Sequence, residues 1–217
     1  MTDFATRREM MVDTQVRPSD VTKFPIIDAM LRVPREVYVP DDQIEAAYAG
    51  RNIEVGKNRV ILEPRTYAKM LDGLNLDRGN LVLDLGCAYG YSSAVIADMV
   101  EAVVAVEEDA TMAREAARLL VEQGVDNAAL VEAPLAVGAP EHGPYDAIIL
   151  EGAAEIVPDA ILAQLKDGGR IAVLFSEGAL GVARIGYKVN GSVSWRFDFN
   201  AAAPVVPGFE KARDFVF

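Results

Sequence analysis

The sequence predicts an α/β protein built on a doubly wound, mostly parallel sheet, with an N-terminal helical segment and a C-terminal antiparallel hairpin. Three observations lead to this prediction. From Leu81 onward, short apolar runs alternate with longer helical patterns, as in a parallel sheet covered on both faces. Before Leu81 the chain has mainly helical patterns and loops. Near its end, residues around Asn190-Gly191 alternate between apolar and polar with a period of two.

The first third of the chain contains four segments of helical pattern, which belong to a predicted N-terminal unit, residues 1–78. Apolar spacing, a capping aspartate, a terminal glycine or a first-turn proline marks each of them. They are ATRREMMVDTQV (5–16), VTKFPIIDAMLRV (21–33), DDQIEAAYAG (41–50) and PRTYAKMLDGLNL (64–76). The stretch NRVILEP (58–64) stands between the last two.

Residues 79–217 are expected to form the cofactor-binding core of the same globular unit. Its predicted strands are LVLDLG, AVVAVEE, NAALVEA, YDAIILEGA and GRIAVLF. Its predicted helices are YSSAVIADMV, ATMAREAARLLVEQG and PDAILAQLKDGG. The strands are continuously apolar, which is typical of strands buried on both faces. The last segment, VARIGYKVNGSVSWRFDFN, is a predicted hairpin because Asn-Gly favours the two-residue turn.

Charge and composition narrow the classes of function. Lys and Arg number 21 against 33 Asp and Glu, which gives a net charge of −12. An acidic chain without a basic cluster repels a phosphate backbone, so no nucleic-acid partner is expected. One histidine and one cysteine, Cys87, cannot build a His/Cys metal site, and no metal is expected.

Neither a membrane partner nor secretion is expected. No apolar run approaches the roughly 18 residues that a membrane-spanning helix needs. The charged N-terminus is unlike a secretory signal, and a lone cysteine fits a reducing compartment. These features predict a soluble cytoplasmic protein, and they leave its oligomeric state open.

A glycine-rich turn joins the first predicted strand of the core to its helix, in VLDLGCAYGYSSAVIA. Such a turn presents backbone N–H groups to a ligand. Dinucleotide sites have the pattern G-x-G-x-x-G, whereas Gly86, Ala88 and Gly90 give G-x-A-x-G, with Tyr91 in the sixth position. The departure favours the related loop that wraps an amino-acid–nucleoside cofactor.

Two acids accompany this turn. Glu107 ends the next strand about 20 residues on, where an acid accepts hydrogen bonds from both ribose hydroxyls. Asp84 precedes the turn and either accepts from a cofactor ammonium group or orders the turn. The alternative is that Gly86 and Gly90 only make a tight turn and that Glu107 is solvated. Cys87 has no histidine near it in sequence, so it is expected to fill space rather than act as a nucleophile.

Several stretches together resemble the protein-L-isoaspartate O-methyltransferases over nearly the whole chain. They are AMLRVPREVYVPDD, AAY, VLDLGCAYGYSSAVIA, VAVEED, GPYDAII and PDAILAQLKDGGRIAV. The resemblance implies the S-adenosylmethionine-dependent methyltransferase fold and methylation of isoaspartyl carboxylates in damaged protein, so the partner is a protein or peptide substrate. By position it also implies cofactor contacts from Asp84, Gly86, Cys87, Ala88, Gly90, Glu107 and Glu108.

The same resemblance identifies NRVILEP as the active-site loop, with a departure. Where the family has Thr-Ile-Ser, one residue and Pro, this chain has Val60-Ile61-Leu62-Glu63-Pro64. The serine expected beside the transferring methyl group and the substrate is therefore Leu62, and no catalytic residue is assigned. The substrate loop is expected to comprise Arg59, Val60, Ile61 and Leu62.

Three further positions depart from the family pattern. Glu54 stands in its Pro-Ile-Gly, and Glu151 replaces a threonine after the fourth strand of the core. Ala133-Pro134-Leu135 replaces Gly-Asp-Gly and removes the carboxylate expected at the adenine. Both glutamates would repel an anionic substrate if they faced the pocket.

These departures leave several interpretations open. The sequence favours a methyltransferase of this family with a degenerate substrate loop. The alternatives are a methyltransferase for a different acceptor, and a non-catalytic relative that acts as a binding protein. Arg59 is expected either on the surface or against an acidic substrate group, where it would partly replace the lost hydroxyls.

Overall fold

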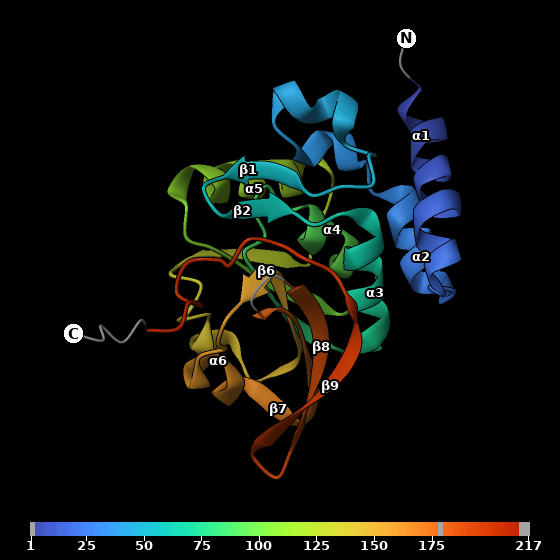
Figure 1. Ribbon diagram of the computed structural model, residues 1–217. Helices are drawn as coiled ribbons and strands as arrows, with labels where there is room; N and C mark the ends of the chain where they lie inside the picture. Colours follow the sequence, from blue (N-terminus) through green and yellow to red (C-terminus); the bar gives the residue numbers. More distant parts are fainter. Residues whose placement is uncertain (1–2, 178–179, 213–217) are drawn as a thin grey trace, which may run out of the picture.

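The computed structural model describes residues 3–177 and 180–212 (Figure 1). Its centre is a seven-stranded sheet in the order β5-β4-β3-β6-β7-β8-β9. The strands are β3 (Leu81–Leu85), β4 (Ala102–Glu107), β5 (Ala128–Glu132), β6 (Tyr145–Ala154), β7 (Leu165–Glu177), β8 (Leu180–Val189) and β9 (Ser192–Asn200). Strands β3 to β7 pair in parallel, and β8 and β9 are added antiparallel. The predicted fold class is confirmed.

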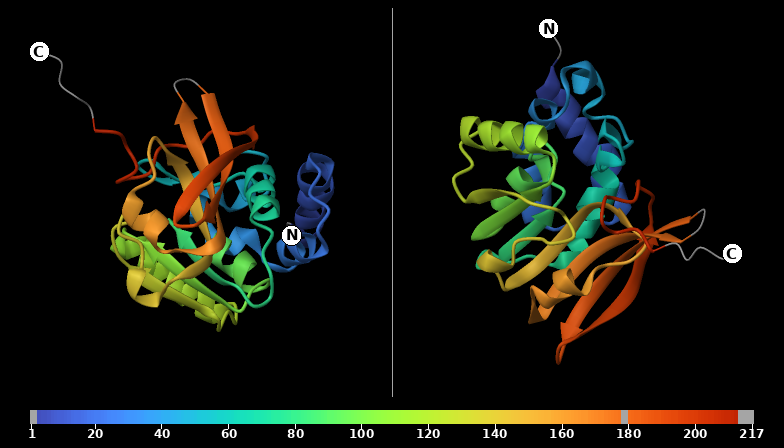
Figure 2. Two further views of the ribbon diagram at one scale, coloured as in Figure 1. Left: turned by 90° about the horizontal axis from the view of Figure 1, so that it is seen from below. Right: turned by 90° about the vertical axis from the view of Figure 1, so that its left-hand side faces the viewer.

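Helices cover both faces of this sheet. They are α1 (Phe4–Met11), α2 (Phe24–Arg32), α3 (Pro64–Leu74), α4 (Tyr91–Ala97), α5 (Ala110–Glu122) and α6 (Asp159–Ala163). The blue N-terminal helices and α5 lie on the same side of the sheet (Figure 2). Their buried side chains share one hydrophobic cluster with α3 and α4, whereas α6 belongs to a cluster on the other face. Among the described residues, no helix is both long and apolar enough to cross a membrane.

Local sequence explains the ends of several elements. The Asp109 side chain caps α5 by accepting hydrogen bonds from the backbone N–H groups of Thr111 and Met112. The β8–β9 turn uses Asn190 at φ 51° and Gly191 at φ 79°, the two positive φ values that this hairpin turn requires. The predicted hairpin is therefore confirmed.

Two predicted helices are wrong in type or length. The segment 41–50 forms a 3-10 helix over Asp41–Ala46 instead of an α-helix, and no side chain caps it. Ala47 and Tyr48, which follow directly, are buried in the core. The helix predicted over PDAILAQLKDGG ends at Ala163. Leu165 pairs with Tyr145 instead, so pairing in the sheet overrides the helical pattern from there on.

The stretch NRVILEP is also more ordered than a loop. Arg59–Ile61 forms strand β2, which pairs antiparallel with β1 (Ile53–Gly56) in a separate two-stranded hairpin. Figure 1 shows this hairpin beside α5 and above the main sheet. A Cβ built on Gly56 would lie 2.9 Å from Met112 Cε, so the hairpin tip rests on the first turn of α5.

A fully buried arginine holds the chain that follows the hairpin. Arg35 Nε donates to the Ala47 carbonyl and Arg35 Nη2 to the Leu62 carbonyl, both at 2.7 Å. The guanidinium carbon lies 4.6 Å from the centroid of the Tyr91 ring, in cation–π geometry. Arg35 thereby joins the N-terminal segment, the end of β2 and the start of α4.

Arg35→Lys is expected to lower the free energy of unfolding by about 2 to 4 kcal/mol, because one ammonium cannot bridge two carbonyls that a planar fork holds. Urea unfolding followed by circular dichroism measures this change. Arg51→Lys is the matched control, since Arg51 is exposed. Equal stability of the two variants would contradict a bridging role for Arg35.

Candidate functional site

The glycine-rich turn lies at the carboxyl end of β3, between its neighbours β4 and β6, where open α/β sheets bind ligands. Three of its residues have positive φ: Gly86 (83°), Ala88 (51°) and Gly90 (95°). The Gly86 N–H donates to the Val106 carbonyl at 2.8 Å, which ties the turn to β4. Gly90 packs against α5, because an added Cβ would lie 3.4 Å from Leu120 Cγ.

Asp84 is completely buried beneath this turn. Its Oδ2 accepts hydrogen bonds from the hydroxyls of Ser92 and Ser93, both at 2.6 Å, so the carboxylate orders the start of α4. Burial raises its pKa to about 6, although the two serine hydroxyls oppose the shift. Its Oδ1 has no hydrogen-bond partner. These hydrogen bonds hold the start of α4, directly after the turn, and a contact between Asp84 and an ammonium group stays a prediction.

Glu107, at the end of β4, is neither solvated nor free. Its Oε1 accepts from Arg59 Nη1 at 2.6 Å and from the N–H groups of Glu108 and Asp109 at 2.9 and 3.0 Å. Its Oε2 accepts from Arg59 Nη2 at 2.6 Å and from the Ala88 N–H at 2.8 Å. A carboxylate has about four lone-pair positions, so these donors saturate it.

Arg59 is therefore not on the surface, which was one of the two expectations for it; in this structure it pairs with Glu107. Only 4% of the residue is exposed. Burial opposes its charge, but the hydrogen bonds and charge of Glu107 outweigh this effect, and the net result is a raised pKa for Arg59. The prediction failed because the partner lies 48 residues away, on another strand, and leaves no local pattern.

Two side chains close over Gly86. A Cβ built on this glycine would lie 3.1 Å from Arg59 Nη2 and 3.5 Å from Leu135 Cδ1. Leu135 is buried, and its N–H is 3.4 Å from the Glu108 carboxylate. Arg59 thus uses the space that the missing side chain of Gly86 provides.

The other residues predicted for the site are buried around it. They are Val60, Ile61 and Leu62 near the end of β2, and Cys87 and Ala88 in the glycine turn. Burial raises the pKa of the Cys87 thiol well above its ordinary value, which agrees with a space-filling role rather than a nucleophile. Among the described residues, no cluster of histidine, cysteine and acidic side chains could hold a metal ion.

The two glutamates expected to depart from the family pattern have different surroundings. Glu54 is exposed on β1. Glu151 lies at the carboxyl end of β6 and is only 3% exposed, and its Oε1 has no hydrogen-bond partner. Burial, reinforced by the charge of Asp84, raises the pKa of Glu151 well above its ordinary value.

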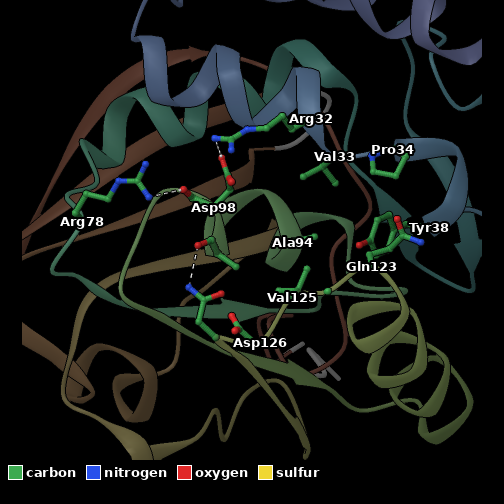
Figure 3. Close-up of a pocket in the computed structure, with 13 residues that line it drawn as sticks. Arg32, Val33, Pro34, Tyr38, Arg78, Ala94, Asp98, Gln123, Val125 and Asp126 are labelled. Atoms are coloured by element: carbon green, nitrogen blue, oxygen red, sulfur yellow. Dashed lines mark hydrogen bonds and ion pairs between the residues drawn. The ribbon is translucent and has the colours of Figure 1, made fainter.

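A cavity of about 480 Å³ lies at the opposite end of the sheet (Figure 3). It opens between α2, the end of α4 and the turn that leads into β5, with Asp98 and the ion-paired Arg32 on its wall. None of the residues that line it belongs to the glycine turn or to the β1–β2 hairpin. It is therefore separate from the candidate site.

The free energy of unfolding should depend on pH through Glu151. Its pKa is raised in the folded protein above the ordinary 4.5, so its stabilising contribution is complete below pH 4.5 and is lost as pH rises through the folded pKa. Glu151→Gln is neutral throughout. We expect the variant to gain about 1 to 3 kcal/mol relative to the parent between pH 5 and pH 8.

Urea unfolding of the parent and the variant at both pH values measures this gain. Glu54→Gln is the matched control, because the Glu54 side chain is exposed in the folded chain. A difference between parent and Glu151→Gln that stays constant with pH would contradict the assignment.

The chain is similar in sequence to proteins of one known family. The family model for protein-L-isoaspartate(D-aspartate) O-methyltransferase matches residues 6–198. The protein-L-isoaspartate O-methyltransferase of Vibrio parahaemolyticus serotype O3:K6 is 33% identical over 183 residues, which cover 84% of this chain and 88% of that protein. The protein of the same name from Opitutus terrae is 35% identical over 166 residues, or 76% and 71% of the two chains.

Solved structures show the same fold. A protein-L-isoaspartate O-methyltransferase structure superimposes with a TM-score of 0.82 at 24% identity, over 93% of this chain and 66% of that chain. A Plasmodium falciparum protein described as a putative enzyme of this kind, in complex with S-adenosyl-L-homocysteine, gives a TM-score of 0.77 at 17% identity, over 94% and 98%. This chain thus belongs to the protein-L-isoaspartate(D-aspartate) O-methyltransferase family, whose members are S-adenosylmethionine-dependent methyltransferases.

Proposed function

We propose that this chain methylates isoaspartyl carboxylates in proteins or peptides, with a substrate loop that positions the acceptor weakly. The observation that carries the proposal is the glycine turn between β3 and α4, with Glu107 at the end of the adjacent strand. S-adenosylmethionine, when bound there, supplies an electrophilic methyl group on a sulfonium. The residues proposed to hold it are Asp84, Gly86, Cys87, Ala88, Gly90, Glu107 and Glu108.

Several residues of the site suit the chemical groups of this cofactor. The unpartnered Oδ1 of Asp84 suits an ammonium group, and Gly86 permits a close approach to the backbone. Glu107 is the acid that suits two ribose hydroxyls, but Arg59 holds it in this structure. The residues fit the cofactor once Arg59 leaves Glu107.

The acceptor chemistry requires little from the protein. An exposed substrate carboxylate is ionised at pH 7 and is itself the nucleophile, so no general base is needed. Positioning is then the main contribution to the rate. We propose that Leu62 stands where relatives have a serine hydroxyl, and that loss of this hydrogen bond lowers the rate by about 10² to 10³.

A different acceptor is the second candidate. Leu62 is fully buried. Glu151, at the C-terminal end of β6, is a buried side-chain carboxyl in addition to that of Asp84. An anionic acceptor placed beside them would lack a partner, and burying it would be costly. A neutral acceptor would avoid this cost. A binding protein without catalysis, a cytoplasmic location and the absence of nucleic-acid partners stay predictions.

Transfer of labelled methyl from S-adenosylmethionine to an isoaspartyl peptide tests the proposal. The label should appear as a base-labile ester, and the matching aspartyl peptide, which differs only in its linkage, should remain unlabelled. Labelling of both peptides or of neither would reject isoaspartyl specificity and favour the second candidate.

Leu62→Ser is expected to raise kcat/KM for the isoaspartyl peptide by about 10- to 100-fold, because it restores a hydroxyl beside the acceptor. Leu62→Ala is the matched control, since it removes the apolar side chain without adding a hydroxyl. Thermal unfolding of both variants accounts for the loss of a fully buried leucine. Equal kcat/KM values for the two variants would show that the hydroxyl has no part in positioning.

A further inference from the structure

We infer that Arg59 determines the affinity of this chain for its cofactor, because its guanidinium occupies the position of the cofactor's ribose on Glu107. The inference rests on the proposed function and deepens it. It concerns the equilibrium between a closed arrangement, in which Arg59 pairs with Glu107, and an open one, in which Glu107 accepts from the ligand.

Saturation of Glu107 is the first observation behind this inference. Two ribose hydroxyls need two acceptor positions, and both oxygens of Glu107 already accept a 2.6 Å hydrogen bond from Arg59 besides their backbone donors. The backbone donors, from Ala88, Glu108 and Asp109, belong to the turn and to the strand end. They come from the main chain beside Glu107, whereas the guanidinium is the one side-chain donor among the residues that the structure describes, so Arg59 is the donor that we expect a ribose to displace.

The second observation is steric and independent of hydrogen bonding. Arg59 Nη2 lies against Gly86, the position where a nucleoside cofactor needs a bare backbone. Leu135 Cδ1 lies near the same glycine, 3.5 Å from an added Cβ. A ligand seated on Gly86 therefore meets the guanidinium even if it makes no contact with Glu107.

Release of Arg59 is opposed by burial of the pair. The side chains of Arg59 and Glu107 are only 5% and 0% exposed, and separating a buried pair leaves charges without partners. A ligand that supplies hydrogen-bond donors to Glu107 can offset the loss for the carboxylate, but not for the guanidinium. Arg59 lies on β2, whose hairpin turn at Lys57 and Asn58 is exposed, so solvent is near for the displaced guanidinium.

The closed arrangement weakens cofactor binding in proportion to how much of the protein adopts it, because only the open fraction can bind. If it is populated at about 90 to 99%, the apparent Kd for the cofactor is raised about 10- to 100-fold. A substitution that removes the guanidinium is then expected to recover this factor. Arg59→Gln suits the purpose, because it is neutral, retains hydrogen-bonding capacity and leaves the backbone donors to Glu107 intact.

Isothermal titration with S-adenosylhomocysteine tests the inference without requiring activity. Arg59→Gln is expected to bind about 10- to 100-fold more tightly than the parent. Adding Glu107→Gln to this variant should remove the gain, because the ribose then loses its carboxylate. Lys57→Gln is the matched control: it removes one positive charge from the same hairpin at an exposed position and should leave Kd unchanged.

Arg59→Lys carries the test if Arg59→Gln does not fold, as judged by its thermal unfolding. Lysine keeps the charge but cannot hold both oxygens of Glu107 with one fork, so its Kd should fall below that of the parent. Equal binding by the parent and the folded variants overturns the inference and leaves the proposed function standing. Absence of binding by the parent and by every folded variant overturns both.

Discussion

The carboxylate of Glu107 is the group on which the arrangement of the site depends. It lies at the end of β4 and accepts hydrogen bonds from three different parts of the chain: the glycine turn, the start of the β4–α5 connection and strand β2. A buried anion requires such partners, since an unpaired carboxylate away from water is strongly unfavourable. The need to satisfy this charge therefore helps to hold the hairpin over the sheet, together with the contacts of Gly56 with Met112 and of Arg35 with the Leu62 carbonyl.

That dependence explains why the site is closed in this structure. A carboxylate that binds both ribose hydroxyls must keep two acceptor positions free of donors from the protein. Water occupies these positions until the ligand binds. Here Arg59 fills them from within the chain, at 2.6 Å on each oxygen. Under the proposed function, the contact that stabilises the hairpin is also the one that the cofactor replaces, so the stability of this region and its affinity for the ligand oppose each other.

Buried polar groups also surround the neighbouring strand ends, and their hydrogen bonds are incomplete. Among the described residues, Asp84 Oδ1, Glu151 Oε1 and Arg59 Nε are buried without a partner. Two raised carboxyl pKa values, of Asp84 and Glu151, have burial as their largest cause. Unsatisfied groups of this kind are destabilising, and those of Asp84 and Glu151 lie near the carboxyl ends of the adjacent strands β3 and β6.

The fold class, the succession of core strands and helices along the chain, the β8–β9 hairpin and the glycine turn could be predicted from the sequence. These features depend on patterns among residues close in the chain, such as apolar periodicity and the Asn190-Gly191 turn. The end of α6, where Leu165 pairs with Tyr145, and the position of Arg59 could not be predicted, because both depend on contacts between distant parts of the chain. A salt bridge across 48 residues has no local pattern, because it forms only when two strands and a hairpin have been brought together.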